Sequence, residues 1–155
     1  FILLQDSPKP NQLGSTGIGG IMSEHEEQKA VIDWATAHAD QYPPLGWLYA
    51  IINGVPLAGS AKQRSRIINY MKAEGMLPGV VDLCLPAARQ EKNGLYIEMK
   101  KQGGKVSEGQ AEFLAYLETE NYHGAVCVGA IEAVELLKWY LGIDCTCVAC
   151  QIAAA

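Results

Sequence analysis

The order of apolar and polar positions along the chain predicts alternating helices and strands. Apolar residues recur at steps of three and four between Ser23 and Asp40, which is helical spacing, and Pro43-Pro44 ends this segment. Further helices are predicted from about Ser60 to Gly75, from Ser107 to about Asn121 and from about Ala130 to Leu141. Strands are predicted at Trp47 to Ile52, Val80 to Leu85, Leu95 to Lys100 and Gly124 to Val128.

This order of elements predicts an α/β fold, with a mixed central β-sheet flanked by helices on both sides. The 155 residues suffice for one globular domain, which we expect at residues 22–142. Residues 1–21 have no periodicity and are interpreted as a linker or expression remnant, and residues 143–155 as a C-terminal tail.

Cysteine usage and the absence of long apolar runs indicate an intracellular, soluble, cytoplasmic protein. No apolar run is long enough to span a bilayer, and Phe1-Ile2-Leu3-Leu4 is too short for a signal-peptide core. The five cysteines are an odd number, which favours reduced thiols. Cys145, Cys147 and Cys150 have a spacing that could ligate zinc, but no fourth cysteine or histidine follows, so a plain tail is the favoured interpretation.

The net charge of −5 argues against a nucleic-acid partner until the charges are placed along the chain. Nine of the twelve basic residues lie between positions 62 and 105, against four acidic residues, so this middle part has a net charge of +5. Such a segment is expected where one surface meets phosphates, although a solvated basic face without a ligand would have the same composition.

Candidate chemistry lies on the strand Leu95 to Lys100. Side chains alternate along a strand, so Glu98 and Lys100 project from the same face, roughly 7 Å apart. If the loop from Pro86 to Gly94 closes an antiparallel hairpin that pairs Leu85 with Leu95, Asp82 lies opposite Glu98 and Val80 opposite Lys100. One register therefore gathers two carboxylates and a lysine.

Two carboxylates placed opposite each other repel, and a divalent cation would compensate. A cation with two carboxylates and an ammonium forms a minimal site for phosphodiester hydrolysis. The alternative is a salt-bridge ladder on a solvated sheet face. We favour a functional site, because helices before and after the hairpin predict a sheet covered on both sides, where three charges would be costly.

These residues also resemble a known family. The ordered motifs Gly75 to Leu83, Gly94 to Lys100 and Gly103 to Gln110 are similar to those of the VRR-NUC (viral replication and repair nuclease) domain of the PD-(D/E)xK superfamily, across roughly Glu24 to Leu141. The resemblance implies a restriction-endonuclease-like core, with Asp82 and Glu98 as ligands of Mg²⁺ or Mn²⁺ and Lys100 acting on the attacking water. The family's usual proline before the aspartate is Val81 here, which we expect to affect backbone geometry more than chemistry.

The resemblance also places an acid of the first helix near the metal. Glu24 and Glu27 rank above Glu26 for this role, although acids in a first helical turn also favour the helix dipole. Gln110 has two possible roles: it fits a capping box with Ser107, whereas the resemblance directs it at the active site.

The sequence hypothesis is a metal-dependent, structure-selective DNA endonuclease that cleaves branched DNA such as four-way (Holliday) junctions, as a homodimer by family resemblance. The backbone of the DNA would be bound by Lys62, Arg64, Arg66, Lys101 and Lys105. The alternatives left open are a catalytically silent DNA-binding module and a nuclease that acts on RNA or linear DNA.

Overall fold

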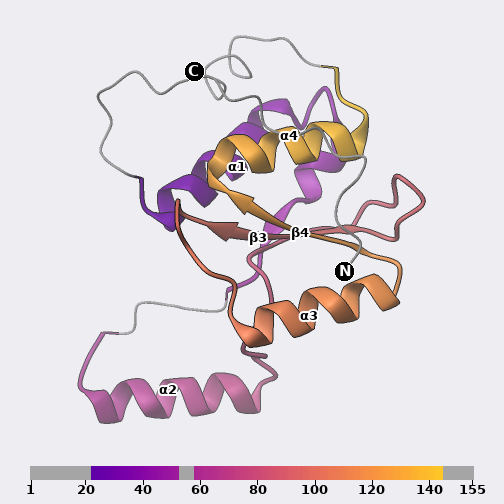
Figure 1. Ribbon diagram of the computed structural model, residues 1–155. Coiled ribbons are helices and arrows are strands. Elements are labelled where there is room, and N and C mark those ends of the chain that lie inside the picture. Colours follow the sequence, from indigo (N-terminus) through magenta and orange to yellow (C-terminus); the bar gives the residue numbers. More distant parts are fainter. Residues whose placement is uncertain (1–21, 53–57, 145–155) are drawn as a thin grey trace.

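The computed structural model of the protein describes residues 22–52 and 58–144. Within these residues a four-stranded sheet forms the middle layer, with the strand order β1-β2-β3-β4 (Figure 1). The first three strands pair antiparallel, and β4 runs parallel to β3. The strands are β1 (Tyr49–Ala50), β2 (Leu83–Leu85), β3 (Leu95–Lys100) and β4 (His123–Val128). The sheet is therefore mixed, as predicted.

Three of the four helices cover the sheet. Helices α1 (Glu24–His38) and α4 (Gly129–Leu141) lie on one face, and α3 (Glu108–Thr119) lies on the other (Figure 1). The fourth, α2 (Ala61–Ala73), precedes β2, and a short 3-10 helix, η1 (Pro43–Trp47), leads into β1. Capping boxes at Ser23, Ser60 and Ser107 begin α1, α2 and α3, because each serine accepts a hydrogen bond from the amide three residues later.

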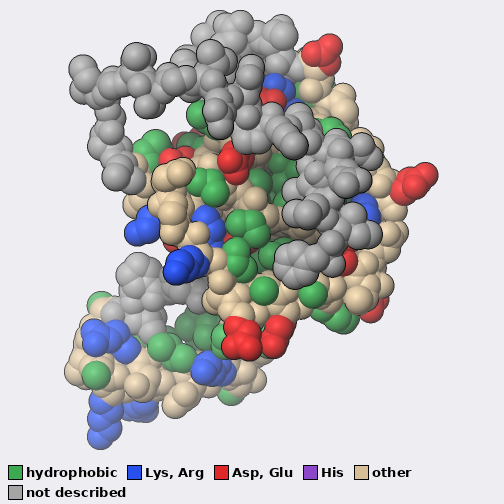
Figure 2. Space-filling model, in the orientation of Figure 1, with side chains coloured by type: hydrophobic (Ala, Val, Ile, Leu, Met, Phe, Trp, Pro, Cys, Tyr) green, Lys and Arg blue, Asp and Glu red, His purple; other side chains and the backbone are tan. Residues whose placement is uncertain are grey.

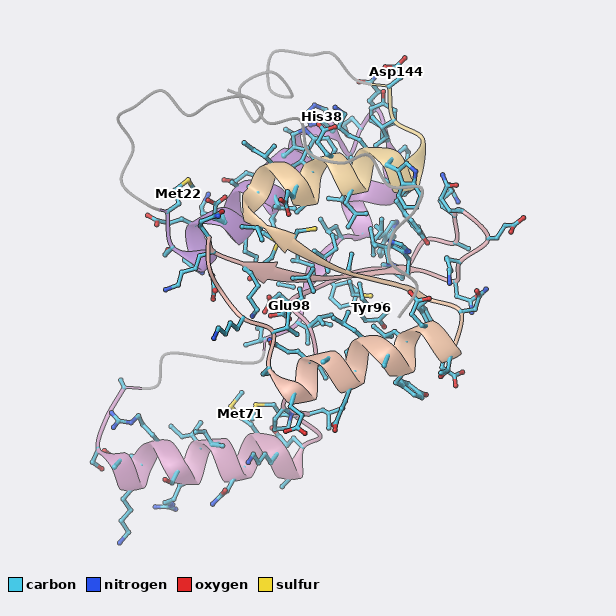
Figure 3. All side chains as sticks on the ribbon, viewed as in Figure 1. Met22, His38, Met71, Tyr96, Glu98 and Asp144 are labelled. Atoms are coloured by element: carbon cyan, nitrogen blue, oxygen red, sulfur yellow. The ribbon has the colours of Figure 1, made fainter. Side chains whose placement is uncertain are left out.

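Side-chain alternation along β3 separates the hydrophobic core from the polar side chains. Leu95, Ile97 and Met99 point into a core shared with Val31 of α1 and Leu137 of α4. The intervening side chains of β3 point towards α3, and Figure 3 shows Tyr96 and Glu98 between the sheet and that helix. One strand thus belongs to two environments, with the apolar core on one side and the candidate site on the other.

Helix α2 lies within the segment predicted to be helical but does not pack on the core. Ile67, Ile68 and Met71 recur at helical spacing, yet no residue of α2 is buried, and Ile67 and Ile68 are 41% and 38% exposed. Figure 1 shows α2 set apart from the other helices, beyond α3. These apolar residues are not part of the core that the described residues form.

Two strands are shorter than predicted. The expected strand from Trp47 to Ile52 is reduced to Tyr49–Ala50, because the prolines begin a 3-10 turn that continues through Trp47. The expected strand from Val80 begins only at Leu83, so the ladder between β2 and β3 does not extend to the expected pair of Val80 and Lys100. Residues 1–21, residues 53–57 and the group of Cys145, Cys147 and Cys150 lie outside the described residues.

No helix within the described ranges has the length and apolar character needed to cross a membrane.

Candidate active site

The hairpin of β2 and β3 has the register expected from the sequence. Leu85 pairs with Leu95 and Leu83 with Ile97, which places Asp82 opposite Glu98 at the point where the ladder stops. The Met99 amide donates a 2.8 Å hydrogen bond to Oδ2 of Asp82, so a side chain continues the ladder in place of the backbone. The backbone oxygen of Asp82 accepts from the Ile51 amide at 2.7 Å. Asp82 is thereby held from both neighbouring strands.

Glu98 is completely buried, and its two carboxylate oxygens differ in their contacts. Oε1 accepts hydrogen bonds from Nζ of Lys100 and from Nε2 of Gln110. Oε2 is buried and has no hydrogen-bond partner among the described residues. A buried acceptor without a donor is costly, and such atoms often mark the place of a ligand or ion.

The pKa of Glu98 is raised to about 7, mainly because burial penalises the charged carboxylate. The negative charge of Asp82 raises it further, whereas the hydrogen bond and charge of Lys100 act in the opposite direction. Two carboxylates of like charge therefore share a site with one lysine. An additional cation there would favour the charged form of both acids.

Gln110 makes two side-chain contacts, one with Ser107 and one with Glu98. Its Oε1 accepts a 2.9 Å hydrogen bond from the Ser107 amide, which completes the cap of α3. Its Nε2 donates to Glu98 from the same side-chain amide. The N-terminus of α3 is thus tied to the carboxylate on β3.

A contact between two glycines brings the segment before Asp82 against the start of α3. Gly79 has a φ of +87°, and a Cβ atom there would lie 2.9 Å from the backbone carbon of Gly109. Only glycine permits both this conformation and this approach. Val81, which replaces the family's usual proline, is completely buried, so it supplies apolar contact at that position.

The acids of the first helix contact backbone amides. Oε1 of Glu24 accepts from the Lys101 amide at 3.3 Å, next to the end of β3. Oε2 of Glu27 accepts from the Ala130 amide at 2.6 Å and so caps α4, which has no side-chain cap of its own N-cap residue. Glu26, ranked below them, is occupied by the Ser23 capping box. Roles of Glu24 and Glu27 as metal ligands stay predictions.

The donor set fits a hard divalent cation in a limited way. Asp82 and Glu98 converge, and Glu98 offers an oxygen without a partner, whereas no cluster of three or more acidic, histidine or cysteine side chains occurs in residues 22–52 and 58–144. Mg²⁺ commonly uses one or two carboxylates and completes its shell with water and phosphate oxygens. Two converging carboxylates are therefore sufficient for such an ion.

The basic residues expected to bind DNA lie at the surface. Lys62, Arg64 and Arg66 are exposed on α2, and Lys101 and Lys105 are exposed after β3. Figure 2 shows Lys and Arg side chains gathered over α2 at the lower left of the molecule. No acidic residue occurs within α2, so this helix presents positive charge to solvent.

The sequence reasoning missed the neighbours of this site on the sheet. Tyr49, Cys84 and Tyr96 form a row across β1, β2 and β3, with Tyr49 opposite Cys84 and Cys84 opposite Tyr96. Extending the Leu85–Leu95 register to Cys84 and Tyr96 would have found the second pair. Nothing in the sequence pairs Tyr49 with Cys84, because these strands are separated by α2.

The mixed sheet flanked by helices defines an α/β domain, in which two carboxylates and a lysine gather on β3 and at the residue preceding β2. A family model, the VRR-NUC domain, matches residues 22–131, which is well over half of the chain. The chain therefore belongs to the VRR-NUC family of nucleases, and a nucleic-acid substrate is implied.

A comparison with solved structures supports the fold. A structure described as a "VRR_NUC domain protein" is 23% identical to this chain, with a TM-score of 0.60, and the match covers 81% of this chain and 93% of that one. A comparison with curated proteins finds no match.

Proposed function

We propose that this chain is a metal-dependent endonuclease that hydrolyses phosphodiester bonds in branched DNA, such as four-way junctions. The observation that carries the proposal is the buried Oε2 of Glu98, which has no partner among the described residues and lies beside a second carboxylate, Asp82. Asp82 and Glu98 would bind Mg²⁺ or Mn²⁺ through their carboxylate oxygens. When bound, such an ion lowers the pKa of water and neutralises charge on a phosphoryl group.

Lys100 and Gln110 complete the proposed chemistry. The ammonium of Lys100 is largely buried and fixed by its contact with Glu98, so it is placed to orient the attacking water and to stabilise negative charge on the phosphate. Gln110 holds Oε1 of Glu98 and leaves Oε2 for the cation. The proposed catalytic set is therefore Asp82, Glu98, Lys100 and Gln110.

Recognition of DNA is proposed to rely on phosphate contacts. Lys62, Arg64 and Arg66 on α2, together with Lys101 and Lys105 near the end of β3, offer positive charge without a base-reading motif. Phosphate contacts supply affinity and position but do not read sequence. This favours a substrate recognised by its shape, which is the basis for proposing branched DNA.

A homodimer is part of the proposal, because two active sites related by a two-fold axis could nick two strands of a junction symmetrically. Its support is the exposed apolar side of α2, which contributes no residue to the core of its own chain. Burial of that side against a second copy would remove Ile67 and Ile68 from water.

The test is a cleavage assay with labelled four-way junctions, linear duplexes and RNA, in Mg²⁺ or Mn²⁺ and in EDTA. We expect metal-dependent cleavage that is fastest on the junction and is lost in Lys100→Ala. Lys29→Ala is the matched control, because Lys29 is exposed on the surface of α1 and pairs with exposed Asp33. DNA binding without cleavage under any condition would instead identify a silent binding module.

A further inference from the structure

The row of Tyr49, Cys84 and Tyr96 takes no part in the proposed chemistry, although it lies on the same sheet face as the carboxylates. Leu83 and Leu85 belong to the core cluster, so Cys84 between them points to the other face, towards the α3 side. A hydrogen bond with the Cys84 thiol raises the pKa of Tyr49, and the same thiol also contacts Tyr96. The two tyrosines thus flank the thiol on the face that carries Glu98.

The two rings differ in what covers them. Tyr96 makes edge contacts with Phe113 of α3 and with Tyr122, whose ring centroids lie 5.9 and 5.5 Å away. Tyr49 is 50% exposed on edge strand β1, while the Cys84 thiol beside it is only 3% exposed. Trp47, which precedes the strand, is also exposed. Helix α3 packs mainly against β4, so the β1 end of this face presents an aromatic surface to solvent.

This surface is close to the proposed scissile site. Asp82 precedes Cys84 by two residues, and its carboxylate acts on Glu98 from the same face. Spacings of about 5 Å between strands and about 7 Å for two residues along a strand place the Tyr49 Cβ roughly 8–9 Å from that of Asp82. The hydrogen bond from the Ile51 amide to the Asp82 oxygen fixes β1 at this position. Tyr49 is therefore held at a distance from the carboxylates that one nucleotide can span.

We propose that Tyr49 is a stacking platform for an unstacked nucleobase whose strand passes over Asp82 and Glu98. Bases inside a duplex have both faces covered by their neighbours, whereas a base at a branch point or in a single strand has a free face for an aromatic ring. The platform selects DNA that carries a base with a free face beside the cleaved phosphate. This inference rests on the proposed nuclease function and adds a specificity-determining residue to it.

The experiment measures binding separately from cleavage. The anisotropy of a labelled oligothymidylate is compared with that of an abasic strand of the same length, in EDTA, because the two strands differ in their bases and share their phosphates. The parent protein is expected to bind the thymidylate more tightly. Tyr49→Ala should lower thymidylate affinity about ten-fold and leave abasic affinity unchanged, whereas Tyr49→Phe and Tyr49→Trp should retain the preference.

Two further variants keep the result interpretable. Tyr49→Leu preserves an apolar cover over Cys84 without an aromatic ring, so it should behave as Tyr49→Ala does even where the alanine variant folds poorly. Tyr116→Ala removes a tyrosine of α3 that is 58% exposed, and it should bind as the parent does. Equal preference for thymidylate in the parent, Tyr49→Leu and Tyr49→Ala would overturn the platform.

Cleavage of junctions by the same proteins separates the two proposals. A parent protein that cleaves in Mg²⁺, together with Tyr49 variants that bind and cleave as it does, would retain the nuclease function and reject the platform. A parent protein that neither binds nor cleaves DNA would reject both. Loss of the thymidylate preference with retained binding to the abasic strand would support the platform.

Discussion

Glu98 is a buried carboxylate whose charge is opposed by burial and by Asp82, and favoured by Lys100. The net effect raises its pKa to about 7, from an ordinary value of 4.5. The folded protein consequently binds this proton more tightly than the unfolded chain does. By linkage, the free energy of unfolding decreases as the pH rises from about 4.5 to about 7, and the decrease ends above that range.

The first prediction follows from this linkage. Without metal, the parent should lose up to a few kcal/mol of unfolding free energy relative to Glu98→Gln as the pH rises through this window. Denaturant titrations of both proteins in EDTA, at several pH values from 4.5 to 8.5, measure this difference. Stabilisation by Mg²⁺ should increase over the same window, because the cation needs the charged carboxylate. A difference that does not vary with pH would contradict the raised pKa.

Gln110 offers a second prediction at this scale, because its contact with Glu98 can be removed separately from the serine half of the α3 cap. Ser107→Ala removes the hydroxyl that accepts from the Gln110 amide and leaves the Gln110 to Glu98 hydrogen bond, whereas Gln110→Ala removes the side-chain hydrogen bonds with the Ser107 amide and with Glu98. Each substitution should reduce stability by about 1 kcal/mol. Only Gln110→Ala should lower metal-dependent cleavage, by roughly 10- to 100-fold, as expected for a residue that orients a metal ligand. Equal activity losses in both variants would assign Gln110 to capping only.

At the scale of elements, the sequence predicted best where one physical rule decides the structure. β3 begins and ends at the predicted residues, since alternation at Leu95, Ile97 and Met99 leaves one way to bury the strand. The same alternation and the hairpin register predicted that Asp82, Glu98 and Lys100 would lie on neighbouring strands. β2 is shorter than predicted because the Asp82 side chain takes the Met99 amide that a longer ladder would use.

Contacts between distant segments could not be predicted from the sequence. The periodicity of α2 identifies which residues share a side, but it contains no information on what that side meets. Similarly, Glu27 was ranked as a metal ligand by its helical position, whereas its contact with the Ala130 amide depends on how α1 packs beside α4. The family resemblance gave the region of the site, and the packing decides what each acid touches.

The contact between Gly79 and Gly109 leads to a third prediction. Gly79→Ala would force a Cβ atom to 2.9 Å from the Gly109 backbone, so the segment leading to Asp82 must move. Gly75→Ala is the matched control, because Gly75 also has a positive φ, of +102°, but nothing lies within 4 Å of its Cβ position. Both should lose about 1–2 kcal/mol from backbone conformation. We expect only Gly79→Ala to lose Mg²⁺-dependent stabilisation as well, which thermal melts with and without Mg²⁺ would measure.

At the scale of the whole molecule, positive charge and unpartnered apolar surface coincide on α2. The chain has a net charge of −5, yet α2 contains Lys62, Arg64, Arg66 and Lys72 and no acid. A helix of 13 residues without buried residues is marginal in water, because isolated helices gain little from backbone hydrogen bonds. The described residues of the chain bury none of this helix, and it can serve both DNA and a second copy only if these use different sides.

The last prediction tests whether DNA and a second copy of the chain bind different sides of α2. Ile67→Lys places a charge on the apolar side of α2 and should convert the proposed dimer to a monomer in multi-angle light scattering. Lys62→Ala is the control: it alters the basic side, so it should weaken DNA binding, reduce the salt dependence of that binding and leave the mass unchanged.

Cleavage products then distinguish a dimer from a chance association. A symmetric dimer should nick both strands of a junction within one encounter, whereas the Ile67→Lys monomer should release singly nicked junctions. Ile67 lies on a helix outside the core, away from the carboxylates in the sequence. If Ile67→Lys nicks the first strand at the parent's rate and the second strand more slowly, the defect is therefore one of dimer formation. A parent protein that is monomeric at all concentrations, and cleaves as Ile67→Lys does, would instead mean that α2 acts on the DNA.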